Sequence, residues 1–246
     1  MHRFYCATAD LNQSVIRIDN SQEIHHMLNV LRLKKGAWVC VFNGSGSEAE
    51  GPIIRRSQTG VEIKVERVRS TIAPVEQPGL ILACAIPKQA KFEFIVEKCT
   101  ELGVDEIVPL LTKRTEVRPD PVRAKRKRER FRRVAVNAAK QCQRVTVPDI
   151  KPITPFCDFL SSLRPGSTVF IPCLEGQRKG LADLILRKIQ TKQIIFLIGP
   201  EGDFTPAEIA LAVKHGCQPV SLGPTTLKVD TAAIGVIAFV NFLLHR

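Results

Sequence analysis

Two short loops in the last third of the chain contain the residues best suited to binding a small molecule. Residues 199–202 (GPEG) follow one apolar run, and residues 223–228 (GPTTLK) follow another. Glycine lets a ligand approach bare backbone, and proline restricts a loop to few conformations. Loops that leave the carboxyl ends of strands line the ligand crevice of an open parallel sheet. We therefore expect the two loops to face one site.

The elements that must position these loops alternate between strands and helices. Residues 80–86 (LILACAI) form a continuous apolar run, which is typical of a strand covered on both faces. Helical spacing of apolar residues follows, until Gly103. Further strands are predicted at 106–111, 167–173, 193–198 and 219–222, and helices at 122–144, 181–189, 205–216 and 232–244. This alternation predicts a parallel α/β sheet.

The first part of the chain has a different pattern. Short strands are predicted at 3–6, 15–18, 38–42, 49–54 and 61–68, with one helix that Ser21 is expected to cap. Short strands around a small helix indicate a compact β-barrel. Residues 69–79 contain two prolines and no periodicity, so we expect a linker there. The predicted domains are residues 1–72 and 73–246.

The charge indicates a polyanionic partner. The 246 residues carry a formal net charge of +12 and a pI near 9.6, with much of the excess in residues 113–133. Lys and Arg contacts to phosphates position a nucleic acid without reading its sequence. Such a run is also compatible with a solvated helix face. A membrane surface is the competing partner, but no amphipathic anchor lies beside the charge cluster, so nucleic acid is favoured.

Cysteine and hydropathy patterns exclude several other classes. The eight cysteines are scattered without a CxxC pair and mostly lie in apolar segments, so we expect buried thiols in a reducing cytosol. No Cys and His cluster has the spacing of a metal site. No apolar run reaches the roughly 20 residues of a membrane span. A cytoplasmic protein without a metal or a membrane segment is therefore expected.

Six blocks spread along the chain resemble one family. They are HRFYC (2–6), HHMLNVLRLKKG (25–36), EKCTELGVDEIVPLLTKRTEV (97–117), AAKQCQR (138–144), IGPEGDF (198–204) and SLGPTTLKVDTA (221–232). In this order they resemble the RsmE family of SPOUT, or α/β-knot, methyltransferases, which methylate N3 of a uridine in 16S ribosomal RNA. The resemblance implies S-adenosylmethionine bound in a trefoil knot, a PUA-like N-terminal barrel for RNA, and a homodimer. The knot follows from the resemblance alone, because threaded chains are very rare.

The resemblance also assigns candidate site residues. We expect the cofactor pocket to be formed by Leu174, Leu197, Gly199, Glu201, Gly202, Leu222, Gly223 and Leu227, with the aliphatic side chains around the adenine. For the RNA we expect Arg3, His26, Arg32, Lys113, Arg114 and Gln141, with Glu101 as a further residue on the substrate side. The barrel residues have alternative interpretations: His26 as a partly buried helix residue, and Arg32 as a complement to the helix dipole.

The expected methyl transfer needs no covalent intermediate with the protein. The chain has no GxGxxG or GxxxxGK[ST] motif, and a sulfonium methyl donor needs alignment with its nucleophile and stabilisation of developing charge. We expect Lys228 and Arg144 to stabilise a uridine anion, and Asp230 to orient one of them or to accept the imide proton. Alternatively, Asp230 is only the N-cap of the last helix, and Lys228 is a solvent-facing loop residue.

Three positions depart from the family pattern, and two other functions remain open. Asp203 replaces the last glycine of GPEGG, while Lys228 and Asp230 replace the arginine and glutamate of the family's RTE. An ammonium group cannot reproduce the bidentate grip of a guanidinium. One alternative function is 2′-O methylation of the SpoU type, although its Ser-Leu-Asn signature is absent. The other is a non-catalytic rRNA-binding assembly factor.

Overall fold

The computed structural model describes residues 1–70, 77–88, 91–174, 178–185 and 191–244. The chain divides into two compact units. The first contains residues 1–74 together with 139–147, and the second contains residues 75–138 and 148–246. The predicted linker lies partly in the last strand of the first unit and partly at residues 71–76, outside the described residues.

The first unit is a six-stranded, mostly antiparallel sheet with an apolar core. The pairing order is β1-β3-β4-β5-β2, and β6 also pairs with β4; only β1 and β3 are parallel. The strands are β1 (His2–Tyr5), β2 (Val15–Ile18), β3 (Trp38–Phe42), β4 (Ser47–Ser57), β5 (Gly60–Lys64) and β6 (Arg67–Ser70). Alternate residues such as Ile16 and Ile18 face the core, as the period of two in the sequence predicts.

The helix of the first unit begins one residue earlier than expected. α1 (Ser21–His25) is capped by Asn20, whose Oδ1 accepts hydrogen bonds from the backbone N–H groups of Gln22 (3.0 Å) and Glu23 (3.1 Å). The prediction of Ser21 as the cap was therefore wrong, because the neighbouring asparagine is an equally good capping residue. A π-helical turn, His26–Val30, continues the helix.

Residues 139–147 associate with the first unit by ion pairing and backbone hydrogen bonds. The Lys140 ammonium contacts the Glu23 carboxylate at 2.8 Å. The Gly46 N–H donates to Val145 O (3.3 Å), and the Val147 N–H donates to Gly44 O (3.0 Å). The glycine-rich turn at 43–47 is therefore also a pairing edge for a segment that is distant in sequence.

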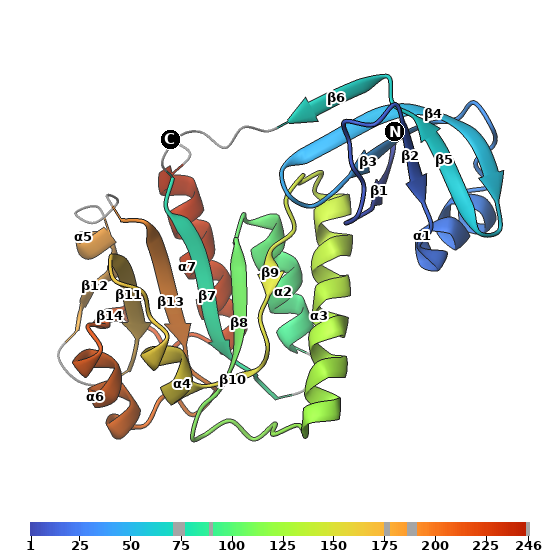
Figure 1. Ribbon diagram of the computed structural model, residues 1–246. Helices are drawn as coiled ribbons and strands as arrows, with labels where there is room; N and C mark the ends of the chain where they lie inside the picture. Colours follow the sequence, from blue (N-terminus) through green and yellow to red (C-terminus); the bar gives the residue numbers. More distant parts are fainter. Residues whose placement is uncertain (71–76, 89–90, 175–177, 186–190, 245–246) are drawn as a thin grey trace. The chain divides into compact units, whose positions relative to one another are not determined.

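The second unit is built on one parallel sheet (Figure 1). The order is β10-β8-β7-β13-β11-β14-β12, and β9 also pairs with β8. The strands are β7 (Gly79–Ala85), β8 (Glu106–Leu111), β9 (Asp149–Ile150), β10 (Thr154–Pro155), β11 (Ser167–Pro172), β12 (Lys179–Gly180), β13 (Gln193–Ile198) and β14 (Gln218–Ser221). The predicted parallel α/β architecture is confirmed, whereas the trefoil knot stays a prediction from the resemblance.

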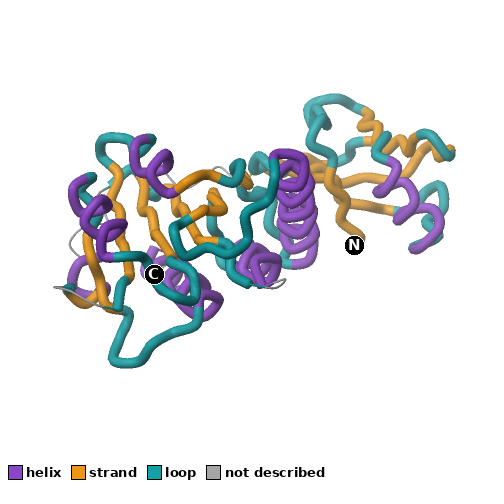
Figure 2. Tube along the Cα trace, turned by 90° about the horizontal axis from the view of Figure 1, so that it is seen from below, coloured by secondary structure: helices purple, strands orange, loops and turns teal. Residues whose placement is uncertain are grey.

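Helices cover both faces of this sheet (Figures 1 and 2). α2 (Lys91–Glu101) packs against α7 (Val229–Leu244), which contacts β7 and β13. On the other face, α4 (Phe156–Ser161) and α6 (Pro206–Lys214) contribute Phe156, Phe159 and Ala212 to a core with the sheet. The remaining helices are α3 (Pro121–Gln141) and α5 (Leu181–Ile185).

Several element boundaries differ from the sequence-based expectations. α3 ends at Gln141 rather than at residue 144, and α7 begins at Val229 rather than at residue 232. Residues 186–189 of the helix expected at 181–189 lie outside the described residues. α4 and the two-residue strands were not anticipated, because they are too short to produce a clear periodicity.

Most cysteines are buried, as expected, but two are not. Cys157 is exposed and Cys142 is half-buried, whereas the other six thiols are buried and all eight are free. Burial raises the pKa of Cys40 to about 12 and that of Cys217 to about 11. In the described part of the chain, no helix is long and apolar enough to span a bilayer, and no group of His, Cys, Asp and Glu could hold a metal ion.

A close backbone crossing leaves no room for a side chain at Gly51 in the first unit. The Glu66 N–H donates to Glu50 O (2.9 Å), so the chain leaving β5 passes directly over β4. A Cβ atom at Gly51 would lie 1.7 Å from Lys64 O. This crossing lets β4 pair with β5 and then with β6.

We predict that Gly51→Ala destabilises the first unit by about 3 kcal/mol, because backbone must move to accept the methyl group. The only tryptophan, Trp38, lies opposite Pro52 in the β3–β4 pair, so its fluorescence during urea unfolding measures this unit. Gly79→Ala is the matched control, since its nearest contact would be an ordinary 3.8 Å. An unchanged Trp38 transition in Gly51→Ala would contradict the crossing.

Candidate functional site

Three neighbouring strands of the second unit end at one pocket. β11 lies between β13 and β14, all three are parallel, and the loops that follow them converge at their carboxyl ends. The pocket has a volume of about 330 Å³. It is lined by backbone and side chains from these loops and from the starts of α2 and α7: Lys91, Pro172, Cys173, Leu174, Arg178, Ile198, Gly199, Pro200, Glu201, Asp203, Ser221, Leu222, Gly223, Thr225, Thr226, Leu227, Lys228, Val229, Asp230 and Ala232.

The pocket collects most of the residues expected to bind a cofactor. Those that line it are Leu174, Gly199, Glu201, Leu222, Gly223 and Leu227, together with Lys228 and Asp230 from the catalytic set. Leu197 does not line it: its side chain is fully buried in the core beneath α4 and α6. Successive strand residues point to opposite faces, and the next residue, Ile198, lines the pocket instead.

Gly202 is also absent from the pocket lining and packs against Arg114. The Arg114 guanidinium donates to the carbonyl oxygens of Gly202 and Phe204. A Cβ at Gly202 would lie 3.3 Å from Arg114 Cδ. Arg114 was expected to contact RNA, and in this structure its guanidinium supports the loop that follows β13.

A second side chain connects the same loop to the segment after β7. The Glu201 carboxylate accepts a hydrogen bond from the Lys88 N–H (3.0 Å). Nearby, the Glu208 carboxylate accepts one from the Lys113 N–H (2.8 Å) and completes a capping box with Thr205 at the start of α6. The loop is therefore held by hydrogen bonds before any ligand binds.

The backbone at Gly223 gives the pocket an open wall. Its φ of +135° lies in a region that residues with a side chain rarely adopt, and no atom lies within 4 Å of a Cβ placed there. A ligand can thus approach this backbone directly. The pocket volume lies within the range of small-molecule sites, roughly 300–1,000 Å³, so a nucleoside-sized group fits.

The start of α7 presents two charged residues to the pocket. Lys228 stands at the N-cap position, where its carbonyl oxygen accepts from the Ala232 N–H (2.8 Å). Asp230 lies in the first turn, so it is not the helix cap. Its Oδ1 is buried and has no hydrogen-bond partner among the described residues. This carboxylate oxygen is available to accept a hydrogen bond from a ligand.

Two further cations at the pocket were missed by sequence reasoning. Lys91 is the first residue of α2, and Arg178 directly precedes β12. Neither belongs to a recognisable motif, so the sequence pattern did not identify them. With Lys228 they are three cations, which equal in number the acidic residues Glu201, Asp203 and Asp230 at the same pocket.

Arg144 and Gln141 belong to the first unit rather than to the unit that contains the pocket. The Arg144 Nε donates to Thr146 Oγ1 (2.7 Å), within the segment that pairs with Gly44. Gln141 is exposed at the last residue of α3. This hydrogen bond of the Arg144 side chain lies within the first unit.

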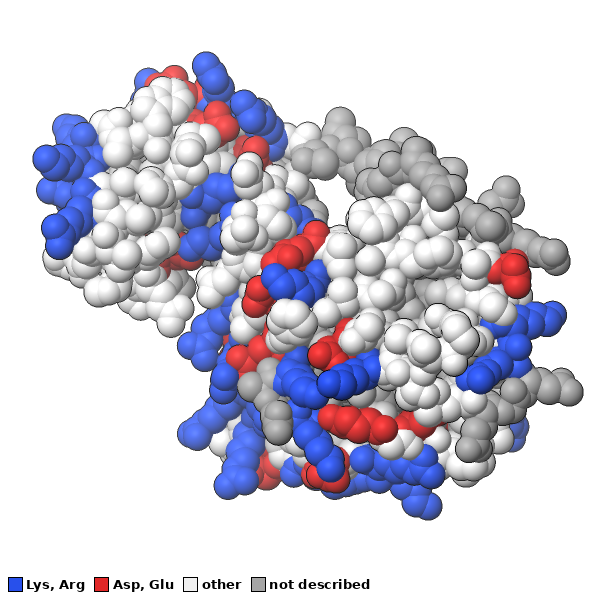
Figure 3. Space-filling model, turned by 180° about the vertical axis from the view of Figure 1, so that it is seen from behind, with Lys and Arg blue, Asp and Glu red and all other residues white. Residues whose placement is uncertain are grey.

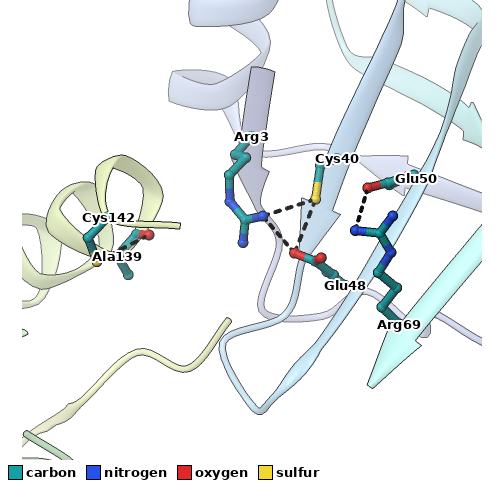
Figure 4. A network of polar contacts seen from close by, with 7 residues as sticks. All are labelled: Arg3, Cys40, Glu48, Glu50, Arg69, Ala139 and Cys142. Carbon is teal, nitrogen blue, oxygen red and sulfur yellow. Dashed lines mark hydrogen bonds and ion pairs between the residues drawn. The ribbon is translucent and has the colours of Figure 1, made fainter. Parts of the chain in front are cut away.

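The N-terminal RNA candidates have different environments. Figure 4 shows Arg3 beside Cys40 and Glu48: Arg3 Nη1 lies 2.6 Å from the Glu48 carboxylate, and the Arg3 side chain is 13% exposed. Burial and the Lys140 ammonium lower the pKa of His26. Arg32 is exposed, with a left-handed φ of +51°. Of these three residues, only Arg32 is exposed.

The basic run predicted to bind phosphates lies largely on α3. Lys125, Arg126, Arg132 and Arg133 are exposed, and the described residues place no carboxylate within ion-pairing distance of them. The buried side of the helix includes Phe131, which packs against Phe92 with ring centroids 4.6 Å apart. Figure 3 shows groups of Lys and Arg on the reverse face of the molecule, interrupted by a few acidic residues.

Comparisons with known proteins agree with this arrangement. A family model described as an RNA methyltransferase domain matches residues 75–241, and one described as an RNA methyltransferase PUA domain matches residues 18–66. A ribosomal RNA small subunit methyltransferase E from Synechocystis is 30% identical over 99% of this chain and 78% of its own length. A Bacillus subtilis protein of the same name is 27% identical over 90% of this chain and 88% of its own.

Solved structures have the same fold over the full length. A ribosomal RNA small subunit methyltransferase E from Neisseria gonorrhoeae, bound to S-adenosylmethionine, covers 99% of this chain and 98% of its own with a TM-score of 0.86 and 26% identity. A putative methyltransferase from Legionella pneumophila in complex with the same cofactor also has a TM-score of 0.86, with 27% identity over 98% and 97% of the two chains. The chain belongs to the RNA methyltransferase family that its sequence motifs resemble, the RsmE family, with a PUA domain before the methyltransferase domain.

Proposed function

We propose that this protein transfers a methyl group from S-adenosylmethionine to N3 of a uridine in 16S ribosomal RNA. The observation that carries the proposal is the convergence of three strand ends on a pocket with an open glycine wall and charged groups. Relatives with the same fold over nearly the whole chain contain S-adenosylmethionine. The cofactor would supply a methyl group already activated for transfer.

The pocket residues divide the binding task between apolar and polar contacts. Leu174, Leu222 and Leu227 offer apolar surface to the adenine, and Gly199 and Gly223 admit the cofactor to the backbone. Leu174 and Leu227 are 47% and 36% exposed, so a ligand would bury surface that now faces water. This burial favours binding without any rearrangement of the sheet.

The catalytic role falls to charges around the reacting nitrogen. The imide of a uridine must lose its proton before N3 can attack, and negative charge then spreads to the flanking carbonyl oxygens. Lys228 at the pocket would stabilise this charge, and Arg144 is proposed as a second cation. Asp230, with its unpartnered Oδ1, would orient a donor or accept the proton.

The RNA partner would be held by charge more than by base stacking. The exposed cations of α3 can displace counterions from phosphates, and Lys113, Arg32 and Gln141 are exposed polar groups available to the same RNA. The chain has one Trp and one Tyr, which leaves few stacking platforms. We propose 16S rRNA of the small ribosomal subunit as this partner, in the cytoplasm.

A homodimer is proposed from an apolar groove along α7. Phe239, Phe242 and Gly235 share one face of the helix, and Phe242 is 65% exposed. The groove beside this face has a volume of about 400 Å³, is lined by residues such as Leu181 and Val236, and shares Leu222, Gly223 and Leu227 with the cofactor pocket. A second copy of the chain would cover it.

Methylation of small-subunit particles from a strain without this activity tests the function. Mass spectrometry of the digested rRNA should find a methyl group on N3 of one uridine. A methyl group on a ribose 2′-oxygen would instead establish the SpoU-type alternative. Specific rRNA binding without cofactor binding in calorimetry would establish the assembly-factor alternative.

We predict that Lys228→Ala slows single-turnover methyl transfer by about 10²-fold, the scale of losing one preorganised charge donor, with nearly unchanged cofactor affinity. Lys228→Arg should retain or improve the rate, because a guanidinium offers two parallel donors. Lys214→Ala, which removes an exposed lysine from the end of α6, is the control. An alanine variant with the wild-type rate would exclude the catalytic role of Lys228.

We predict that the protein has twice the 27.3 kDa chain mass in light scattering at micromolar concentration. Phe242→Glu should weaken this dimer by about tenfold or more, because it places a charge on the exposed apolar face of α7 beside the groove. Phe94→Glu is the matched control, since Phe94 is 47% exposed on α2. A monomeric wild-type protein would contradict the proposed dimer.

A further inference from the structure

One peptide group at the rim of the pocket is held at both of its polar ends by charged side chains. The Cys173–Leu174 peptide presents the carbonyl oxygen of Cys173 and the N–H of Leu174. Arg178 Nη1 donates to the carbonyl oxygen at 2.5 Å. The Asp203 carboxylate accepts from the Leu174 N–H at 2.9 Å. Both Arg178 and Asp203 line the pocket.

Asp203 reaches this peptide because of its own backbone conformation. The Asp203 N–H donates to Pro200 O (2.9 Å), which closes a turn after β13. The φ of Asp203 is +60°, in the left-handed region that glycine, Asn and Asp tolerate best. Its Oδ1 accepts from the Phe204 N–H (2.7 Å), so Oδ2 is directed toward Leu174. A glycine here would permit the turn but provide no carboxylate.

The hydrogen bond between Leu174 and Asp203 joins two loops that are distant in sequence. Leu174 follows β11 and Asp203 follows β13, and the strands themselves pair only up to Phe170 and Phe196. Beyond that point β11 is paired only with β14 on its other side, so the β11–β13 ladder does not connect the two loops. A hydrogen bond to a carboxylate is stronger than one between neutral groups, and a planar peptide fixed at both ends has little freedom to rotate.

We propose that Asp203 and Arg178 act as a positioning pair that sets the Leu174 wall of the cofactor pocket. The inference rests on the proposed function, because it assigns that pocket to S-adenosylmethionine. The pair acts on cofactor binding and not on the methyl-transfer step. Without the pair, the Leu174 wall samples other positions, and the free energy needed to order it when the cofactor binds weakens the observed affinity.

Calorimetric titration of S-adenosylmethionine into the full-length protein tests the pair. Asp203→Gly removes the carboxylate but keeps a residue suited to positive φ, and should weaken cofactor binding by about tenfold, on the order of losing one hydrogen bond to a charged acceptor. Asp203→Asn retains one acceptor oxygen, so its affinity for the cofactor should lie between those of the wild type and Asp203→Gly. Arg178→Ala, which releases the other end of the peptide, should weaken binding in the same direction.

Non-additivity separates the pair from two independent contacts. Since both side chains act through one peptide, Asp203→Gly with Arg178→Ala should weaken binding clearly less than the product of the single effects. In the single variants, the methylation rate at saturating cofactor should stay within about twofold of the wild-type rate, and the midpoint of urea unfolding should be unchanged. Asp10→Gly, which removes an exposed turn carboxylate from the first unit, is the control.

Two results would overturn the inference without touching the proposed function. One is wild-type affinity for the cofactor in Asp203→Gly, and the other is a loss of rate at saturating cofactor with unchanged affinity. If the wild-type protein itself binds no S-adenosylmethionine, the proposed function fails instead.

Discussion

Lateral hydrogen bonding of β11 to β13 on one side and to β14 on the other is the constraint on which the site depends. The register pairs Phe170 with Phe196, and their stacked rings lie 5.5 Å apart in the buried interior. Because all three strands run in the same direction, their carboxyl ends meet at one edge. Loops far apart in sequence thereby form one pocket, and no individual loop has to be long or rigid.

The strands of this sheet could be predicted because they are apolar on both faces, and a continuous apolar run needs no partner to be recognised. The two-residue strands β9, β10 and β12 could not, since their pairing is imposed by neighbours. That residues 139–147 belong to the first unit could not be predicted either, because this depends on contacts between residues distant in sequence, such as Lys140 with Glu23. A sequence pattern indicates which structure a segment can form, but not which distant segment it will contact.

The same limit applies to the site. The glycines and the charged residues at the start of α7 were predicted because loop chemistry and a family resemblance both indicate them. Leu197 was placed in the pocket although the alternation of β13 directs it into the core, and Ile198 has the opposite orientation. Lys91 and Arg178 are at the pocket only because the fold brings them there. Asp203 departs from the family pattern, yet its left-handed backbone explains why few residue types suit the position.

The discontinuous make-up of the first unit has a consequence for biosynthesis. Its sheet is encoded before residue 71, but its ion-pair partner Lys140 and its edge at Thr146 are encoded after much of the second unit. A nascent chain that has exposed only the N-terminal strands lacks these contacts, although domains generally fold as they leave the ribosome. Closing the intervening chain between Glu23 and Lys140 costs conformational entropy that grows only slowly with its length. The first unit therefore reaches full stability late in translation, when part of the second unit has already been made.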